Sequence, residues 1–204
     1  RVVPDPDGLA TAMQQVGAFA LAFSDDAAVL LNLSPGAYTA HISGQAGTSG
    51  VALGEIYAVD QGRSRLINSS VRGTVGTGEN VLIPGFTVSG GPRLILVRAA
   101  GPALDQFGVP DTLDQPSMVL RHSTGFTVAT NQGWTTGFDP SAVQARAALV
   151  GAFPFSTQSA DSAVLVALDA GGYTVTVAGV GGGTGAALVE AYDANGILRT
   201  PTNQ

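Results

Sequence analysis

The sequence contains no cysteine and no lysine, and it carries little charge of either sign. Without cysteine, the chain can form neither disulfides nor thiolate metal sites. Its nine basic residues are all arginines scattered along the chain, and 15 acidic residues bring the net charge to −6. Nucleic acids and anionic lipids are bound by clustered basic faces. We therefore expect no nucleic-acid partner and no binding to an anionic membrane.

Long hydrophobic runs are also missing. The longest, "VGAFALAF" over residues 16–23, is far shorter than the roughly 20 apolar residues that cross a bilayer as a helix. The sequence thus predicts no insertion into a membrane. Charged residues make up only 12% of the chain, compared with about 25% in an ordinary domain. Such a surface must be covered by small polar residues or by a neighbouring chain.

What the chain does contain is an internal repeat. The segment "GAYTAHISGQAGTSGVALGEIY" at residues 36–57 returns as "GGYTVTVAGVGGGTGAALVEAY" at residues 171–192. The similarity extends back to Leu9 in the first copy and to Val143 in the second, and both copies contain the tetrapeptide VGAF. The copies are separated by the length of a domain, whereas solenoid repeats have periods of about 20–50 residues. The repeat therefore indicates a duplicated part of a domain.

The repeated segments have the period-two pattern of strands with one buried face. In "AVLVALDAGGYTVTVAGV", residues 163–180, apolar side chains alternate on either side of a Gly-Gly pair. We expect a hairpin here and a third strand after it, so that each copy is a short helix followed by a three-stranded meander. The unrepeated segment adds strands broken at "GTGEN" and "SGGP" and a hairpin over "STG". The sequence predicts an all-β fold, an antiparallel β-sandwich of jelly-roll-like type with one or two short helices.

This pattern divides the chain into unequal parts. Residues 63–198 are expected to form a complete sandwich, made of an N-half (63–134) and a C-half (143–195). Residues 1–60 are expected to form an extra C-half, and residues 199–204 a tail. Two arrangements of the surplus are open at this point: both C-halves pack on the one N-half within a chain, or the extra C-half packs against another chain.

Two groups of motifs carry a family resemblance. The stretches "DQPSMVLRHSTGFTVATNQGW" and "SADSAVLVALDAGGYTVTVAGVGGGTGAALVEAYD" resemble bacterial pre-peptidase C-terminal domains, which are accessory β-sandwiches of secreted proteins. The stretches "SRLINSSVRGTVGTGENVLIPGFTVSG", "LILVRAAGPALDQFGV" and "TNQGW" are similar to a tandem repeat of large exported proteins of Verrucomicrobia-type bacteria. The resemblance implies a β-sandwich and a secreted, extracellular or cell-surface location, and it implies no single activity.

Residues for catalysis or cofactor binding are few. The sequence has no nucleophile-elbow, zinc-protease, P-loop or dinucleotide motif. Its only imidazoles, His41 and His122, are expected on strands, facing solvent or an interface. Calcium could be held by Asp25 with Asp26, or by Asp161 with loop oxygens, but aspartates before strands more commonly cap turns. We expect no enzyme activity, no metal and no cofactor.

Two further sets of side chains invite a role. Glu55 and Glu190 occupy equivalent positions, each two residues before a tyrosine, and a carboxylate on a semi-apolar strand needs a partner such as Arg72 or Arg98. We expect structural ion pairs. Trp134, the only tryptophan, could stack on a sugar ring, although core packing is the alternative that we favour.

Two functional hypotheses follow. The first is an extracellular structural module, a self-associating subunit of a fibre, filament or surface array that is completed by exchange of strands or half-domains between copies. It rests on the surplus C-half, because three strands with one apolar face cannot stay exposed. The alternative is an accessory module of a secreted hydrolase that binds carbohydrate or targets a polysaccharide substrate.

Overall fold

The computed structural model of the chain describes residues 6–21, 26–59, 65–137 and 139–195. It divides into two compact units, Arg1–Leu66 and Ile67–Gln204, so the boundary lies a few residues beyond the predicted end of the extra C-half. The predicted tail at residues 199–204 lies outside the described residues.

No helix among the described residues has the length and apolar character needed to cross a membrane.

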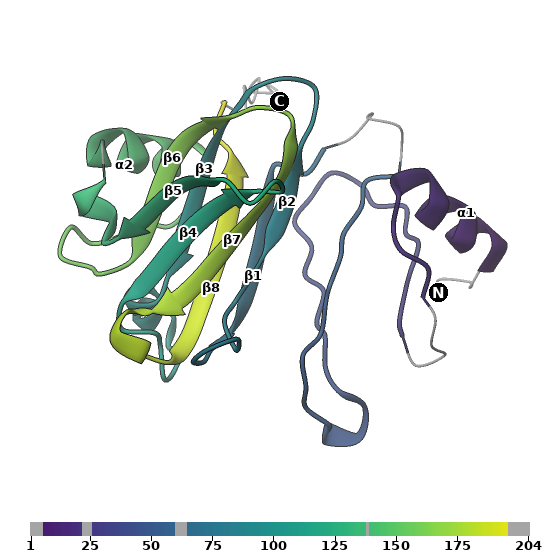
Figure 1. Cartoon of the computed structure of the whole chain (residues 1–204), viewed down its shortest axis with the longest axis horizontal. Coiled ribbons are helices and arrows are strands. Elements are labelled where there is room, and N and C mark those ends of the chain that lie inside the picture. The colour runs from purple at the N-terminus through teal and green to yellow at the C-terminus, as the bar shows by residue number, and fades with distance from the viewer. Residues whose placement is uncertain (1–5, 22–25, 60–64, 138, 196–204) are drawn as a thin grey trace, which may run out of the picture. The chain divides into compact units, whose positions relative to one another are not determined.

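The second unit is a sandwich of two four-stranded antiparallel sheets, drawn in teal to yellow in Figure 1. One sheet has the order β1-β8-β3-β6 and the other the order β2-β7-β4-β5. The N-half supplies the strands β1 (Asn68–Val75), β2 (Gly85–Val88), β3 (Arg93–Ala100), β4 (Pro116–His122) and β5 (Thr127–Gln132). The C-half supplies β6 (Ser162–Leu168), β7 (Gly171–Gly179) and β8 (Gly185–Asp193). The predicted all-β antiparallel sandwich is confirmed.

The main core lies between the two sheets and follows from the alternation of side chains along each strand. On β7, Tyr173, Val175 and Val177 point inward and are buried, while Thr174 is exposed. Leu120 on β4 and Val97 on β3 belong to the same cluster. The predicted hairpin over "STG" is the β4–β5 pair.

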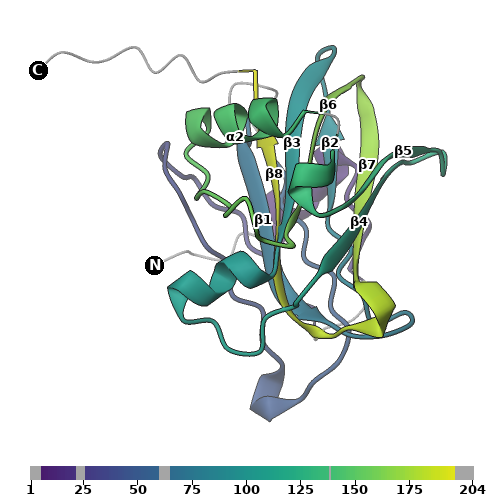
Figure 2. The same cartoon turned by 90° about the vertical axis from the view of Figure 1, so that its left-hand side faces the viewer.

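A second, smaller cluster lies on the outer side of the β1-β8-β3-β6 sheet, where it includes Leu96 of β3 and Val143 of the helix α2 (Pro140–Leu149). In Figure 2, α2 lies on the side of this sheet away from β4 and β7. The helix begins at Pro140, and the Asp139 carboxylate accepts a hydrogen bond at 2.9 Å from the amide of Ala142. A hydrogen bond from the Ser141 hydroxyl, and next the bond from the Ala142 amide, lower the pKa of Asp139.

The prediction that the C-half forms a three-stranded meander is wrong. Strands β6, β7 and β8 make no ladder with one another: β6 pairs with β3, β7 lies between β2 and β4, and β8 lies between β1 and β3. The Gly-Gly pair at residues 171–172 begins β7, and the chain between β6 and β7 passes from one sheet to the other. Every strand of the C-half therefore depends on strands of the N-half for its hydrogen bonds.

The first unit has the predicted short helix but not the predicted strands. Helix α1 covers Pro6–Val16, and a 3₁₀ turn, η1, covers Gln45–Gly47. Across the described residues 26–59 no strand is assigned. The meander predicted for the extra C-half is thus also wrong: β6, β7 and β8 pair only with N-half strands, and the described residues of the first unit contain no N-half strands for the equivalent segments to pair with.

The assigned core predicts that truncating a buried apolar side chain destabilises the fold much more than truncating an exposed one. Leu120→Ala removes a fully buried side chain from between the sheets and should lower the free energy of unfolding by about 2–5 kcal/mol. Phe126→Ala, on the exposed β4–β5 turn, should change it by no more than about 0.5 kcal/mol. Urea unfolding of both variants measures this, and equal losses would contradict the assigned core.

Candidate functional site

The most unusual group in the second unit is an arginine buried in a β-sheet. Along β3, Ile95 and Val97 face the core between the sheets, so Leu96 and Arg98 face the outer side of the same sheet. Arg98 is only 1% exposed. A buried guanidinium must be paired to be tolerated, and its surroundings show how this is done.

Arg98 lies directly opposite Glu190 of the neighbouring strand β8, and its Nε is 3.5 Å from Glu190 Oε2. Its guanidinium carbon is 4.5 Å from the ring centre of Phe153 and 3.9 Å from that of Phe155. Cation–π contacts between a desolvated guanidinium and an aromatic ring contribute about 2 kcal/mol or more. Among the described residues, the three side-chain nitrogens of Arg98 have no hydrogen-bond partner. The charge is therefore held by one carboxylate and two aromatic rings.

A tyrosine completes the arrangement. The hydroxyl of Tyr192 donates a hydrogen bond of 2.6 Å to Glu190 Oε1, which leaves Oε2 for Arg98. Burial, and next the bond to Glu190, raises the pKa of Tyr192, so the hydroxyl keeps its proton and remains a donor. Burial lowers the pKa of Arg98, while the negative charge of Glu190 acts in the opposite direction. We call Arg98, Glu190, Tyr192, Phe153 and Phe155 the arginine cluster.

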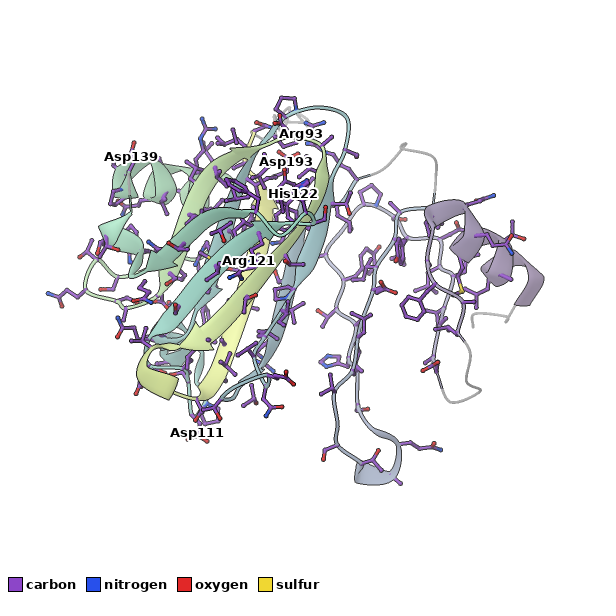
Figure 3. All side chains as sticks on the ribbon, in the orientation of Figure 1. Arg93, Asp111, Arg121, His122, Asp139 and Asp193 are labelled. Atoms are coloured by element: carbon purple, nitrogen blue, oxygen red, sulfur yellow. The ribbon has the colours of Figure 1, made fainter. Side chains whose placement is uncertain are left out.

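The structure brings Arg98 and Glu190 together but not Arg72. Arg72 lies opposite Leu188 in the β1–β8 ladder and is exposed. A different ion pair joins Arg93 and Asp193 at 3.8 Å, at the end of the sheet where both are labelled in Figure 3.

Asp161 is a structural residue as well. It is fully buried, and its Oδ1 accepts hydrogen bonds from the amides of Gly101, at 2.7 Å, and Ala103, at 3.3 Å. The Ser159 hydroxyl donates to its other oxygen. These bonds fix the start of the 3₁₀ helix η2 (Pro102–Phe107).

Trp134 has no open face for a sugar. The side chain is 3% exposed, packs near Phe155, and donates its indole N–H to the carbonyl of Ser156 at 2.9 Å. The ring therefore belongs to the smaller core cluster, and it ties the N-half to the C-half.

The remaining candidates do not converge on a site. His122 contacts the Tyr173 ring and Thr124, while His41 is exposed in the first unit. Figure 3 shows His122 and Asp139 well apart on the second unit. Within the described part of the chain, no three His, Asp or Glu side chains gather where they could hold a metal ion. Asp26 is exposed, and Asp25 lies outside the described residues.

The first unit shares two local backbone features with the second. Gly17 ends α1 with φ +71°, as Gly151 follows α2 with φ +75°. The turn η1 corresponds to η4 (Val180–Gly182), and both contain two successive residues of positive φ. The extra C-half therefore has the same local backbone at these two places.

A close backbone approach next to this turn is also shared. A Cβ on Gly44 would collide with the carbonyl oxygen of Thr48, and one on Gly179 would collide with that of Gly183. Only glycine fits at either position. The two copies are therefore built for the same turn.

Side-chain hydrogen bonds are shared too. Tyr38 donates to the carbonyl of Ser34 at 2.7 Å, as Tyr173 donates to that of Asp169 at 2.9 Å. Near the end of each copy a tyrosine bonds a glutamate two residues earlier: the Tyr57 hydroxyl donates to Glu55 Oε1 at 3.1 Å, matching the bond from Tyr192 to Glu190. This bond raises the pKa of Tyr57.

What differs between the copies is burial. Leu33 is 55% exposed where its counterpart Leu168 is 2% exposed, and Ile42 is 67% exposed where Val177 is fully buried. The extra C-half thus has the local form of a C-half and lacks the strands that cover one.

Sequence reasoning identified the Arg98–Glu190 combination but missed the two aromatic rings. Phe153 ends the tetrapeptide VGAF, which was visible as a repeat, and Phe155 follows two residues later. Their spacing to Arg98 is long in sequence, so only the fold places them over the guanidinium. The repeated VGAF was the available signal.

No protein-family model matches the sequence, and no curated protein matches it. Among solved structures, the chain is similar to the pre-peptidase C-terminal domain of the collagenase from Bacillus anthracis, with a TM-score of 0.39 and 13% sequence identity. The match covers 61% of this chain and 89% of that one. A likeness at this level supports no statement about activity, ligand or partner.

The arginine cluster predicts a large cost for breaking the buried pair. Arg98→Met leaves the Glu190 charge buried and unpaired, and should lower the free energy of unfolding by about 3–5 kcal/mol. Adding Glu190→Leu should recover part of this loss. Arg93→Met, which breaks a partly exposed pair, should cost about 1 kcal/mol or less. Urea unfolding of the three variants and the parent chain tests the assignment, and equal effects of Arg98→Met and Arg93→Met would refute it.

The tyrosines of the two copies form a matched pair for a second test. Tyr192→Phe leaves a buried carboxylate oxygen without its donor and should cost about 1–3 kcal/mol. Tyr57→Phe makes the same change on an exposed residue and should alter stability by no more than about 0.5 kcal/mol. The measurement is the midpoint of thermal or urea unfolding. Equal shifts would mean that both copies are packed alike.

Proposed function

We propose that the chain is a non-catalytic structural module that joins other units of the same β-sandwich repeat, building a fibre, filament or surface array. The observation that carries this proposal is the extra C-half: its turns and tyrosine bonds match those of the C-half, yet its apolar strand residues are exposed.

Physical chemistry supports association through this segment. Each large apolar side chain gains about 1.5–3 kcal/mol on full burial. The exposed ones in the extra C-half include Val29, Leu31, Leu33, Tyr38, Ile42 and Leu53. Extended backbone without a ladder also presents free N–H and C=O groups, which another strand can satisfy by β-augmentation. Contacts that join unlike faces of successive units produce open-ended assemblies.

We place this module outside the cell, as a secreted or cell-surface protein, and the support is its sequence resemblance to exported tandem-repeat proteins. The low charge content suits a unit whose surfaces pair with neighbours. The buried arginine cluster supports a mechanical role over a catalytic one, because its charges are enclosed within the fold and are not open to a substrate.

The oligomeric state of the purified chain tests this proposal. We expect light scattering to give masses well above the 20.4 kDa of a single chain, and negative-stain microscopy to show regular particles or filaments. Replacing Ile42 and Leu53 by Ser, both exposed in the first unit, should reduce the assembly without unfolding the second unit. A monomer at all concentrations would contradict self-association.

A further inference from the structure

The strand pairing in the second unit indicates which strands the extra C-half needs as partners. This inference rests on the proposed function. We propose that residues 6–59 are the C-terminal part of a second β-sandwich. They bind a polypeptide segment of the same kind as the N-half, in which an arginine at the position of Arg98 pairs with Glu55. The partner is thus an N-half that has no C-half of its own.

The strands of this partner follow from the ladders of the second unit. Residues 38–42 correspond to the part of β7 that lies between β2 and β4. Residues 51–57 correspond to the part of β8 that lies between β1 and β3, and residues 29–33 to the part of β6 that pairs with β3. In the second unit no C-half strand forms a ladder with another C-half strand, so the equivalent segments of the extra C-half call for N-half strands.

Glu55 is the polar anchor of this surface. Its Oε1 accepts the hydrogen bond of Tyr57, as Glu190 Oε1 accepts that of Tyr192, and in the second unit the other oxygen faces Arg98. The ring of Phe153 over that arginine has its counterpart in Phe19, which is 56% exposed. Leu21 stands where the second unit has Phe155, so the incoming arginine meets one aromatic ring and one aliphatic side chain.

A count of halves explains why the partner must be an unpaired N-half. The 204 residues hold one N-half, and β6, β7 and β8 already occupy it. Exchange of C-halves can join identical chains into larger assemblies, but it still leaves one C-half uncovered in each chain. A segment resembling residues 65–138, without its own C-half, removes this surplus. Helix α1 begins at Pro6 and α2 at Pro140, so such a segment can enter α1 as the N-half enters α2.

Disulfide trapping tests this partner, because the chain has no cysteine of its own. The probe is a copy of residues 65–138 fused ahead of Arg1 of the full chain. In the second unit Val119 lies opposite Thr176, and Thr176 corresponds to His41. With Val119→Cys in the fused N-half alone and His41→Cys, we expect a disulfide between positions 41 and 119 in most molecules, identified by peptide mass.

Three controls make the result decisive. The chain without the fused segment, carrying V119C and T176C, must form the disulfide, which shows that the geometry permits the bond. Replacing H41C by A40C, whose side chain points to the other face, should abolish the bond. Glu55→Gln should lower its yield, whereas Glu79→Gln, on an exposed turn, should not.

Absence of the 41–119 disulfide while the V119C/T176C control oxidises would overturn the proposed partner. An undiminished yield with Glu55→Gln would overturn the arginine–glutamate anchor. These outcomes are distinct from that of the light-scattering test. If the chain alone is a monomer but the fused chain forms the 41–119 disulfide, self-association is refuted and the proposed partner is supported.

Discussion

The structure depends on one constraint: the three strands of the C-half hydrogen-bond only to strands of the N-half. Each of β6, β7 and β8 lies beside a strand that comes much earlier in the chain. Backbone N–H and C=O groups that find no partner and no water are costly, so each C-half strand depends on the N-half strands beside it. The same sequence pattern therefore has two outcomes in this chain. It is a buried half-sandwich where an N-half is present and an extended, exposed segment where none is.

The arginine cluster adds to this constraint by fixing the register between a C-half strand and an N-half strand. Burying Arg98 and Glu190 costs solvation free energy, and the gain from their attraction is often no larger. What the pair adds is register, since the two residues face each other across β3 and β8, and a shift by one position would move one of them into the core between the sheets. Retention of Glu55 and Tyr57 in the extra C-half carries this register information into the first unit, where the β3 strand that holds Arg98 has no counterpart among the described residues.

The sequence was informative about local structure and misleading about pairing. Period-two alternation and turn residues located the strands of the second unit and the β4–β5 hairpin, because those signals are local. The Gly-Gly pair at residues 171–172 has the composition of a hairpin turn, but its flanking strands lie in different sheets, and only distant partners decide that. Burial of Trp134 also depends on Phe155, which is far away in sequence. The repeat identified the equivalent glutamates, whereas the aromatic cover of Arg98 required the fold.

Amide hydrogen exchange of the unmodified chain tests the central claim most directly, because both copies are present in one sample and serve as each other's control. At concentrations where the chain is monomeric, we expect residues 173–177 on β7 to be strongly protected and the equivalent residues 38–42 to exchange at nearly the rate of an unstructured peptide. Equal protection of the two segments would show that a C-half can find strand partners without a second N-half, and would contradict the account.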